Sequence, residues 1–103
     1  LDGRREDLII TGGVNVYPLE VEQVLREHPA VADVAVYGVD APTWGRRVCA
    51  AVVGDVGEPD LDAWCREHLA PPKRPKTWLL VDDLPRTLTG KVRRDLLADR
   101  TDA

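Results

Sequence analysis

Two nearby segments, residues 31–39 and 47–53, are apolar at almost every position. Successive side chains of a strand point to opposite faces, so each segment predicts a strand that is buried on both sides. Residues 40–43 predict the loop between them. Such strands need a sheet with at least partial cover on each face, which favours helices packed on a small sheet. The longest apolar run, residues 48–53, is far too short to cross a bilayer.

The sequence before this pair predicts a hairpin and a helix. Residues 8–10 and 14–17 are short strand-like segments, and the turn between them is Thr11–Gly13. Pro18 suits the first position of a helix, and Pro29 ends it. This helix has one apolar stripe, formed by Val21, Val24, Leu25 and His28.

The sequence after the pair predicts a turn at 54–59, a second helix, a strand at 77–81, a loop at 84–90 and a last helix at 92–99. Pro71 and Pro72 end the second helix, and Leu96 and Leu97 of the last helix are expected to face inward. The apolar face of the second helix contains Leu61, Trp64, Cys65 and His68. The predicted fold class is therefore α+β, with a small mixed sheet of about three strands, helices packed on it and a two-stranded N-terminal hairpin.

Length and composition indicate one small folded domain spanning residues 1–103. Apolar residues make up 44% of the chain and charged residues 31%, which excludes a disordered or collagen-like chain. Most enzymes that enclose a substrate are longer than this. Because the chain opens inside a motif, at Gly3 and Arg4, we expect it to be part of a longer protein.

The charge is unevenly distributed. Residues 1–70 carry 6 basic and 13 acidic side chains, whereas residues 71–103 carry 8 basic and 5 acidic ones, and the whole chain has a net charge of −4. A cationic face on an acidic domain favours a discrete anion such as a phosphorylated small molecule. Nucleic-acid binding is not expected, because it usually needs a net basic domain and aromatic stacking platforms.

The two cysteines, Cys49 and Cys65, have neither C-x-x-C nor zinc-site spacing. We expect both to be buried, reduced thiols, which suits a cytoplasmic protein. Cys65 and His68 share one helix face, but two ligands do not make a metal site, so no metal site is predicted.

The segment Pro85–Lys91, which reads Pro-Arg-Thr-Leu-Thr-Gly-Lys, is the sharpest motif. A Walker phosphate loop would need Gly at position 85 and Ser or Thr at 92, and Pro85 and Val92 exclude it. What remains is Lys91 beside a glycine at the start of a helix. Its ammonium could neutralise two anions that approach each other, and the alternative is a lysine that is simply solvated.

A second motif lies near the start of the chain. Gly3–Asp7 leads into the segment 11–18, which contains the adjacent glycines Gly12 and Gly13. Without side chains, these glycines would let another chain or a ligand approach the backbone closely. The alternative is an ordinary hairpin turn.

Together, the two motifs resemble the adenylate-forming enzymes, the superfamily of acyl- and aryl-CoA synthetases, peptide synthetase adenylation domains and beetle luciferases. The segment 3–18 resembles their hinge and following hairpin, and the segment 84–92 resembles their C-terminal catalytic-lysine motif. The resemblance spans almost the whole chain. It implies a mobile C-terminal domain that caps a large N-terminal domain, which is absent from this sequence. The 103-residue chain alone is then expected to be inactive.

The resemblance also implies substrates and residue roles. ATP with Mg, together with the carboxylic acid, would bind mainly to the large domain, and CoA would enter for the second half-reaction. Lys91 would be catalytic, and Glu6 would be the hinge residue. ATP or AMP would contact Arg4, Asn15 and Lys91. CoA would contact Gly12, Gly13, Trp44, Arg74 and Lys76.

The function expected from the resemblance is an ATP-dependent acid–CoA ligase. Two alternatives stay open: an adenylation domain that transfers to a carrier protein, and a free-standing binding module of the same fold. Retention of Lys91 with its loop favours the ligase, since a binding module has no need of it. This sequence does not specify the acid substrate, because the acyl pocket belongs to the large domain in the family that it resembles.

Overall fold

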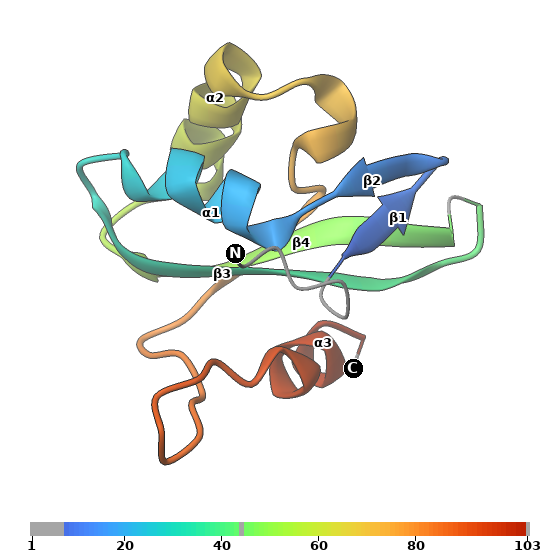
Figure 1. The fold of residues 1–103 in the computed structure, drawn as a ribbon. Coiled ribbons are helices and arrows are strands. Elements are labelled where there is room, and N and C mark those ends of the chain that lie inside the picture. Colours follow the sequence, from blue (N-terminus) through green and yellow to red (C-terminus); the bar gives the residue numbers. More distant parts are fainter. Residues whose placement is uncertain (1–7, 44, 103) are drawn as a thin grey trace.

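The computed structural model describes residues 8–43 and 45–102, in which one sheet lies between two layers of helices (Figure 1). The α+β class and the mixed sheet predicted from the sequence are confirmed. In chain order, the elements are β1 (Ile9–Thr11), β2 (Val14–Val16), α1 (Pro18–Arg26), β3 (Val31–Ala41), β4 (Gly45–Gly54), α2 (Glu58–His68), the 3-10 helix η2 (Pro71–Lys73), β5 (Thr77–Leu80) and α3 (Arg94–Asp102).

The sheet is built on the two long strands. β3 and β4 pair antiparallel, and β5 lies parallel to β4 on its other side. The hairpin β1–β2 joins the same sheet, because Thr11 of β1 pairs with Gly45 of β4. The described sheet therefore has five strands, with the order β2-β1-β4-β3 and with β5 beside β4. The hairpin, predicted as a separate addition, extends the sheet, and β3 is an edge strand.

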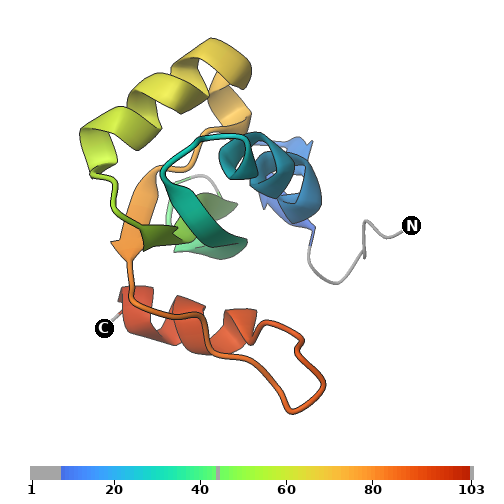
Figure 2. The ribbon, with the colours of Figure 1, turned by 90° about the vertical axis from the view of Figure 1, so that its left-hand side faces the viewer.

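Both faces of the sheet are covered, as the two apolar strands required. Figure 2 shows α1 and α2 on one side and α3 on the other. The first cluster of buried side chains lies under α1 and α2 and consists of Ile9, Val16, Val21, Leu25, Val34, Val36, Val48, Ala50, Val52, Leu61, Cys65, Leu69 and Trp78. The second lies under α3 and consists of Ala35, Tyr37, Val39, Cys49, Ala51, Leu84 and Leu97. Alternate residues of β3 and β4 thus feed opposite layers.

The first helix ends earlier than its apolar pattern suggested. α1 stops at Arg26, so His28 lies beyond it and not in its stripe. The residue before a proline is disfavoured in helical conformation, and Pro29 follows His28 directly. The His28 ring instead packs edge-on against Trp64, with ring centroids 4.9 Å apart. His68, predicted on the buried face of α2, is exposed.

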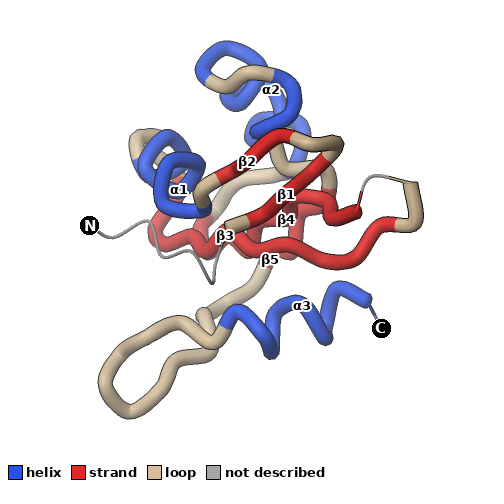
Figure 3. The backbone as a smooth tube through the Cα atoms, turned by 45° about the vertical axis from the view of Figure 1, so that its right-hand side comes forward, coloured by secondary structure: helices blue, strands red, loops and turns tan. Residues whose placement is uncertain are grey.

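The last helix starts later than predicted. Val92 forms an isolated antiparallel bridge, so the chain is still extended there and α3 begins at Arg94. Leu97 is fully buried, whereas Leu96 is 39% exposed, so the prediction that both face inward is wrong for Leu96. The inward stripe is Arg94, Leu97, Ala98 and Thr101, which are i, i+3, i+4 and i+7. The first and last residues of this stripe are polar, so a pattern of apolar residues at helical spacing does not reveal it. Figure 3 shows the loop that precedes α3 projecting from the body of the domain.

Candidate active site

The loop between β5 and α3 closes on itself. Arg86 and Val92 form the isolated antiparallel bridge at its neck. The Thr87 amide donates to the Lys91 carbonyl at 2.8 Å, and the Gly90 amide donates to the Thr87 carbonyl at 2.9 Å. Gly90 has a φ of +93°, a conformation that side-chain-bearing residues rarely adopt. Gly90 therefore permits the tight return that brings Lys91 back to the neck.

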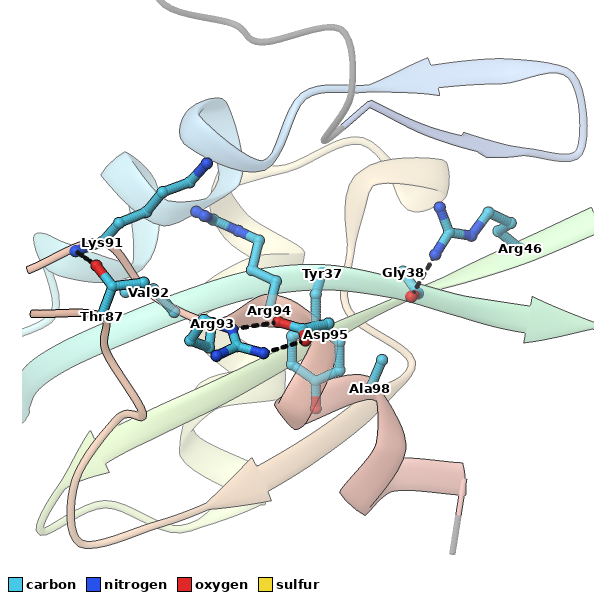
Figure 4. Close-up of a pocket in the computed structure, with 10 residues that line it drawn as sticks. All are labelled: Tyr37, Gly38, Arg46, Thr87, Lys91, Val92, Arg93, Arg94, Asp95 and Ala98. Atoms are coloured by element: carbon cyan, nitrogen blue, oxygen red, sulfur yellow. Dashed lines mark hydrogen bonds and ion pairs between the residues drawn. The ribbon is translucent and has the colours of Figure 1, made fainter.

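Lys91 has a fixed backbone and an unengaged side chain. Its backbone amide donates to Thr87 Oγ1 at 3.1 Å. Its side chain is exposed and makes no hydrogen bond or ion pair with any residue in 8–43 or 45–102. In Figure 4, the side chains of Lys91 and Arg94 point in the same general direction, away from the loop. The ammonium is thus available to a ligand or a partner domain, and its catalytic role stays a prediction.

A pocket of about 460 Å³ lies beside this loop (Figure 4). Its lining consists of Tyr37, Gly38, Arg46, Thr87, Lys91, Val92, Arg93, Arg94, Asp95 and Ala98. Four of these residues are basic and one is acidic, although the chain has a net charge of −4. A recess lined by one sign of charge concentrates ligands of the other sign. The pocket therefore suits an anion, as the uneven charge pattern suggested.

Arg46 is the pocket residue that the sequence reasoning missed. It lies on β4 opposite Asp40, yet its guanidinium crosses β3 and donates to the Gly38 carbonyl at 2.6 Å. A Cβ on Gly38 would lie only 3.1 Å from Arg46 Cζ and 3.1 Å from Ile9 Cγ1, so the glycine makes room for the crossing. A glycine inside an apolar strand often marks such a close approach, and Gly38 was the available signal.

Arg93 and Asp95 form a two-point ion pair at the mouth of the pocket. Arg93 donates from Nε and NH2 to the two carboxylate oxygens of Asp95, at 2.9 and 2.7 Å. The hydrogen bond from Arg93 lowers the pKa of the Asp95 carboxyl, and the bond to Asp95 raises the pKa of Arg93. Both groups therefore stay charged near neutral pH, and Arg93 is locally neutralised.

The glycine hairpin presents bare backbone to its surroundings. Gly12 and Gly13 have φ values of +55° and +83°, and a Cβ built on either one meets no atom within 4 Å. Within the described chain, only backbone conformation demands glycine there, so any need for an empty space must come from another molecule. Asn15 on β2 is exposed. Figures 1 and 3 show this hairpin and the loop of residues 81–93, called the lysine loop because it carries Lys91, at separate ends of the domain. The structure therefore does not bring Asn15 and Lys91 together.

The two cations predicted to contact CoA are bound to backbone carbonyls. Arg74 is half-buried and donates to the Leu69 carbonyl at 2.8 Å and to the Arg66 carbonyl at 3.2 Å, at the end of α2. Lys76 donates to the Pro71 carbonyl at 3.0 Å. Because η2 contacts β2, these cations lie on the same side of the domain as the glycine hairpin.

Arg4, Glu6 and Trp44 lie outside the described residues, so their predicted roles stay predictions. The other predicted site residues fall into two groups. Lys91 lies with the basic pocket, and the glycine hairpin lies with Arg74 and Lys76.

The described residues show neither a metal centre nor a reactive thiol. No three His, Cys, Asp or Glu side chains among them gather closely enough to hold a metal ion. Cys49 and Cys65 are buried and form no disulfide, as predicted. Burial, followed by the nearby Asp62 carboxylate, raises the pKa of the Cys65 thiol to about 11. Of the helices in this part of the chain, none has the length and apolar character needed to cross a membrane.

Comparison with known families and proteins agrees with this layout. Residues 20–91 match the family described as "AMP-binding enzyme C-terminal domain". The 2-succinylbenzoate–CoA ligase of Bacillus licheniformis is 50% identical over 96 residues, which are 91% of this chain and 20% of that protein. The chain thus spans about a fifth of the length of the curated relatives that it matches.

Solved structures of similar sequence share the fold. ATP-bound MatB from Rhodopseudomonas palustris has a TM-score of 0.89 at 40% identity, over 94% of this chain and 20% of that one. The o-succinylbenzoate CoA synthetase of Bacillus subtilis, in complex with its acyl-adenylate intermediate, has a TM-score of 0.86 at 44% identity, over 91% of this chain and 20% of that one.

Proposed function

The chain belongs to the family of AMP-binding enzyme C-terminal domains, and we propose that it is the mobile C-terminal domain of an acid–CoA ligase. The ligase joins a carboxylic acid to CoA in two steps. ATP first converts the acid to an acyl-adenylate and releases pyrophosphate, and the CoA thiol then displaces AMP. Two of the relatives compared above are named as a CoA ligase and a CoA synthetase, which favours CoA over a carrier protein as the acceptor.

One observation carries the proposal: Lys91 and the hairpin of Gly12 and Gly13 lie on separate faces. Lys91 extends beside a basic pocket with no side-chain partner among the described residues, and the bare backbone of Gly12 and Gly13 lies elsewhere, near Arg74 and Lys76. The face that carries Lys91 is called the lysine face here, and the face that carries Gly12 and Gly13 is called the glycine face. A domain that turns between the half-reactions would present the lysine face for adenylation and the glycine face for thioester formation. The partner of both faces is the enzyme's own large N-terminal domain.

Lys91 would act by charge and position. Its ammonium would lie between the acid carboxylate and the α-phosphate of ATP, where it offsets their repulsion and the charge that develops toward pyrophosphate. The loop fixes the Lys91 backbone at Thr87, so only the lysine side chain remains to be ordered on binding.

The remaining substrates would bind mainly to the large domain. The described residues offer no cluster of carboxylates for Mg, which would accompany ATP there. The identity of the acid is also set in that domain, so the proposal stops at a carboxylic acid. We place the enzyme in the cytoplasm, where ATP and CoA are supplied. Residues 1–103 alone are expected to form no acyl-adenylate.

Separate assays of the two half-reactions test the proposal in the full-length enzyme. Lys91→Ala should lower acid-dependent ATP–pyrophosphate exchange about 100-fold or more, the loss typical of one electrostatic contact in a transition state. Thioester formation from supplied acyl-adenylate should stay within about twofold of the wild-type rate, because that step would use the glycine face.

Lys73→Ala is the matched control, since Lys73 is a second surface lysine whose ammonium is instead paired with Glu20 at 2.8 Å. It should leave pyrophosphate exchange unchanged. Equal loss in both half-reactions of Lys91→Ala, or loss with Lys73→Ala, would refute the assigned role of Lys91.

A further inference from the structure

Glu22 is the one buried charged side chain among the described residues, with 3% of its surface exposed. It reaches from α1 to the edge of the sheet, where its Oε2 accepts a hydrogen bond from the Val36 amide at 2.8 Å. The same oxygen accepts one from Arg94 NH2 at 2.6 Å. Arg94 Nε in turn donates to the Val36 carbonyl at 2.9 Å. The backbone amide and carbonyl of one β3 residue, Val36, are thus bound by a carboxylate from α1 and a guanidinium from α3.

The clamp lies at the free edge of β3. Carbonyls that face away from β4 recur at alternate residues, and three successive ones, at Val34, Val36 and Gly38, each accept from an arginine. The Val34 carbonyl accepts from Arg26 at 3.3 Å, and the Gly38 carbonyl accepts from Arg46 at 2.6 Å. At Val36, between them, the edge amide and carbonyl are both bound, and that site is the most buried of the three. These side chains take the place that a further strand would fill.

A buried ion pair is a poor source of stability, because desolvation offsets most of the attraction. Its geometry is nevertheless narrow, since Arg94 bonds two acceptors from one planar group and Glu22 accepts two donors on one oxygen. Such an arrangement fixes position more than it adds free energy. What it fixes is the start of α3, where Arg94 is the first residue.

The lysine loop is fastened to that position. Arg94 follows Lys91 by three residues, and the Arg93 amide donates to the Pro85 carbonyl at 2.8 Å, which closes the neck just before α3. On the other side of the neck, Arg86 pairs with Asp33, which lies on β3 like Val36, at 2.5 Å. The side chains of that second pair are 40% and 30% exposed, so solvent weakens it, and Arg94 provides the stronger attachment.

We propose that the Glu22–Arg94 clamp on Val36 is the positioning device for Lys91. It holds the C-terminal end of the lysine loop, at Arg94, on β3. The Lys91 ammonium therefore reaches the adenylation site in one defined position. Neither Glu22 nor Arg94 needs to touch substrate for this. The inference rests on the proposed function of Lys91.

Arg94→Met removes the guanidinium bonds to Glu22 and to the Val36 carbonyl and keeps a side chain of similar length. In the full-length enzyme, it should lower kcat of the adenylation half-reaction about 10- to 100-fold, which is the cost of a misplacement of roughly 1 Å. The KM for ATP and thioester formation from supplied acyl-adenylate should change less than about twofold, since the glycine hairpin is on another face. Arg94→Lys should be nearly as impaired, because one ammonium cannot make both bonds in one plane.

A double-mutant cycle with Lys91→Ala separates positioning from general structure. If Arg94 acts through Lys91, Arg94→Met should cost nothing further in adenylation once Lys91 is removed. Lys73→Met is the matched control, because it also removes a cation paired with a carboxylate of α1, in this case Glu20 at 2.8 Å, and it should leave the adenylation half-reaction unchanged. If Arg94→Met fails to fold, Glu22→Gln, which keeps the shape and removes the charge, should give the same selective loss at a smaller factor.

The proposal is overturned by equal loss in both half-reactions, by an additive cycle, or by full activity of Arg94→Met or Arg94→Lys. These outcomes differ from failure of the proposed function, in which Lys91→Ala itself leaves adenylation intact. Selective loss in Arg94→Met that disappears in the Lys91→Ala background supports the clamp.

Discussion

Leu97→Ala tests whether the two faces of the sheet behave as separate layers. Leu97 is the fully buried residue of α3, and it packs in the cluster that contains Tyr37, Val39 and Leu84. Replacing a buried leucine by alanine costs roughly 2–5 kcal/mol. α3 is a single outer helix that can settle toward the cavity, so we expect the lower part of this range, about 2–3 kcal/mol.

The expected readout is local. Each 1.4 kcal/mol corresponds to about a tenfold change in an equilibrium constant, so the amides of α3 should exchange with solvent about 30- to 150-fold faster. Hydrogen exchange followed by mass spectrometry of the full-length protein measures this for peptides from α3 and α2 separately. Because the lysine loop leads into α3, adenylation should fall as well.

Leu61→Ala is the matched control. Leu61 is also fully buried, but it lies in the other cluster, under α2. Its loss should accelerate exchange in α2 and leave both α3 and adenylation unchanged. Equal acceleration of both helices by either variant, or unchanged exchange of α3 in Leu97→Ala, would refute the reasoning, because the layers would then open as one unit.

Three further predictions follow from single residues. Gly13→Ala meets no atom within 4 Å but must adopt a φ of +83°, so thermal denaturation should show a loss of about 1–2 kcal/mol, with thioester formation reduced and pyrophosphate exchange retained. Burial raises the pKa of Cys65 to about 11, so this thiol should resist a disulfide reagent at pH 8 until urea unfolds the chain. Burial also raises the pKa of Tyr37 above 10.0, despite the opposing hydrogen bond with Thr101. The pKa of Tyr37 is higher in the folded state than in the unfolded state, so its contribution to stability should be lost as the pH rises through the folded-state pKa. Absorbance at 295 nm should show a late phenolate transition, and Tyr37→Phe should remove it.

The parts of the fold that the sequence predicted depend on local signals. Continuous apolar segments located the two long strands, and Pro18 marked the start of α1. The motif around Lys91 indicated the loop, and adjacent glycines indicated the hairpin turn. Each signal lies within a few residues of what it specifies, so a short window of sequence contains it.

Apart from the early end of α1 before Pro29, the errors discussed here concern residues whose partners are distant. Leu96 was expected to be buried, but the position of α3 depends on Arg94, whose carboxylate partner Glu22 lies 72 residues away. The hairpin joins the sheet through Thr11 and Gly45, a pairing that no local pattern indicates. Arg46 reaches the pocket because Gly38, on the neighbouring strand, leaves room for it.

By itself, the sequence determined the elements, the strands buried on both faces, and the loop that carries Lys91. Only the tertiary structure decided that Glu22 and Arg94 meet at one residue of β3, Val36, and that the lysine and glycine motifs lie on separate faces. The physical reason is that secondary structure follows from side-chain pattern and backbone preference. The position of Arg94, by contrast, depends on where a buried carboxylate and an edge peptide come to lie once the two layers pack.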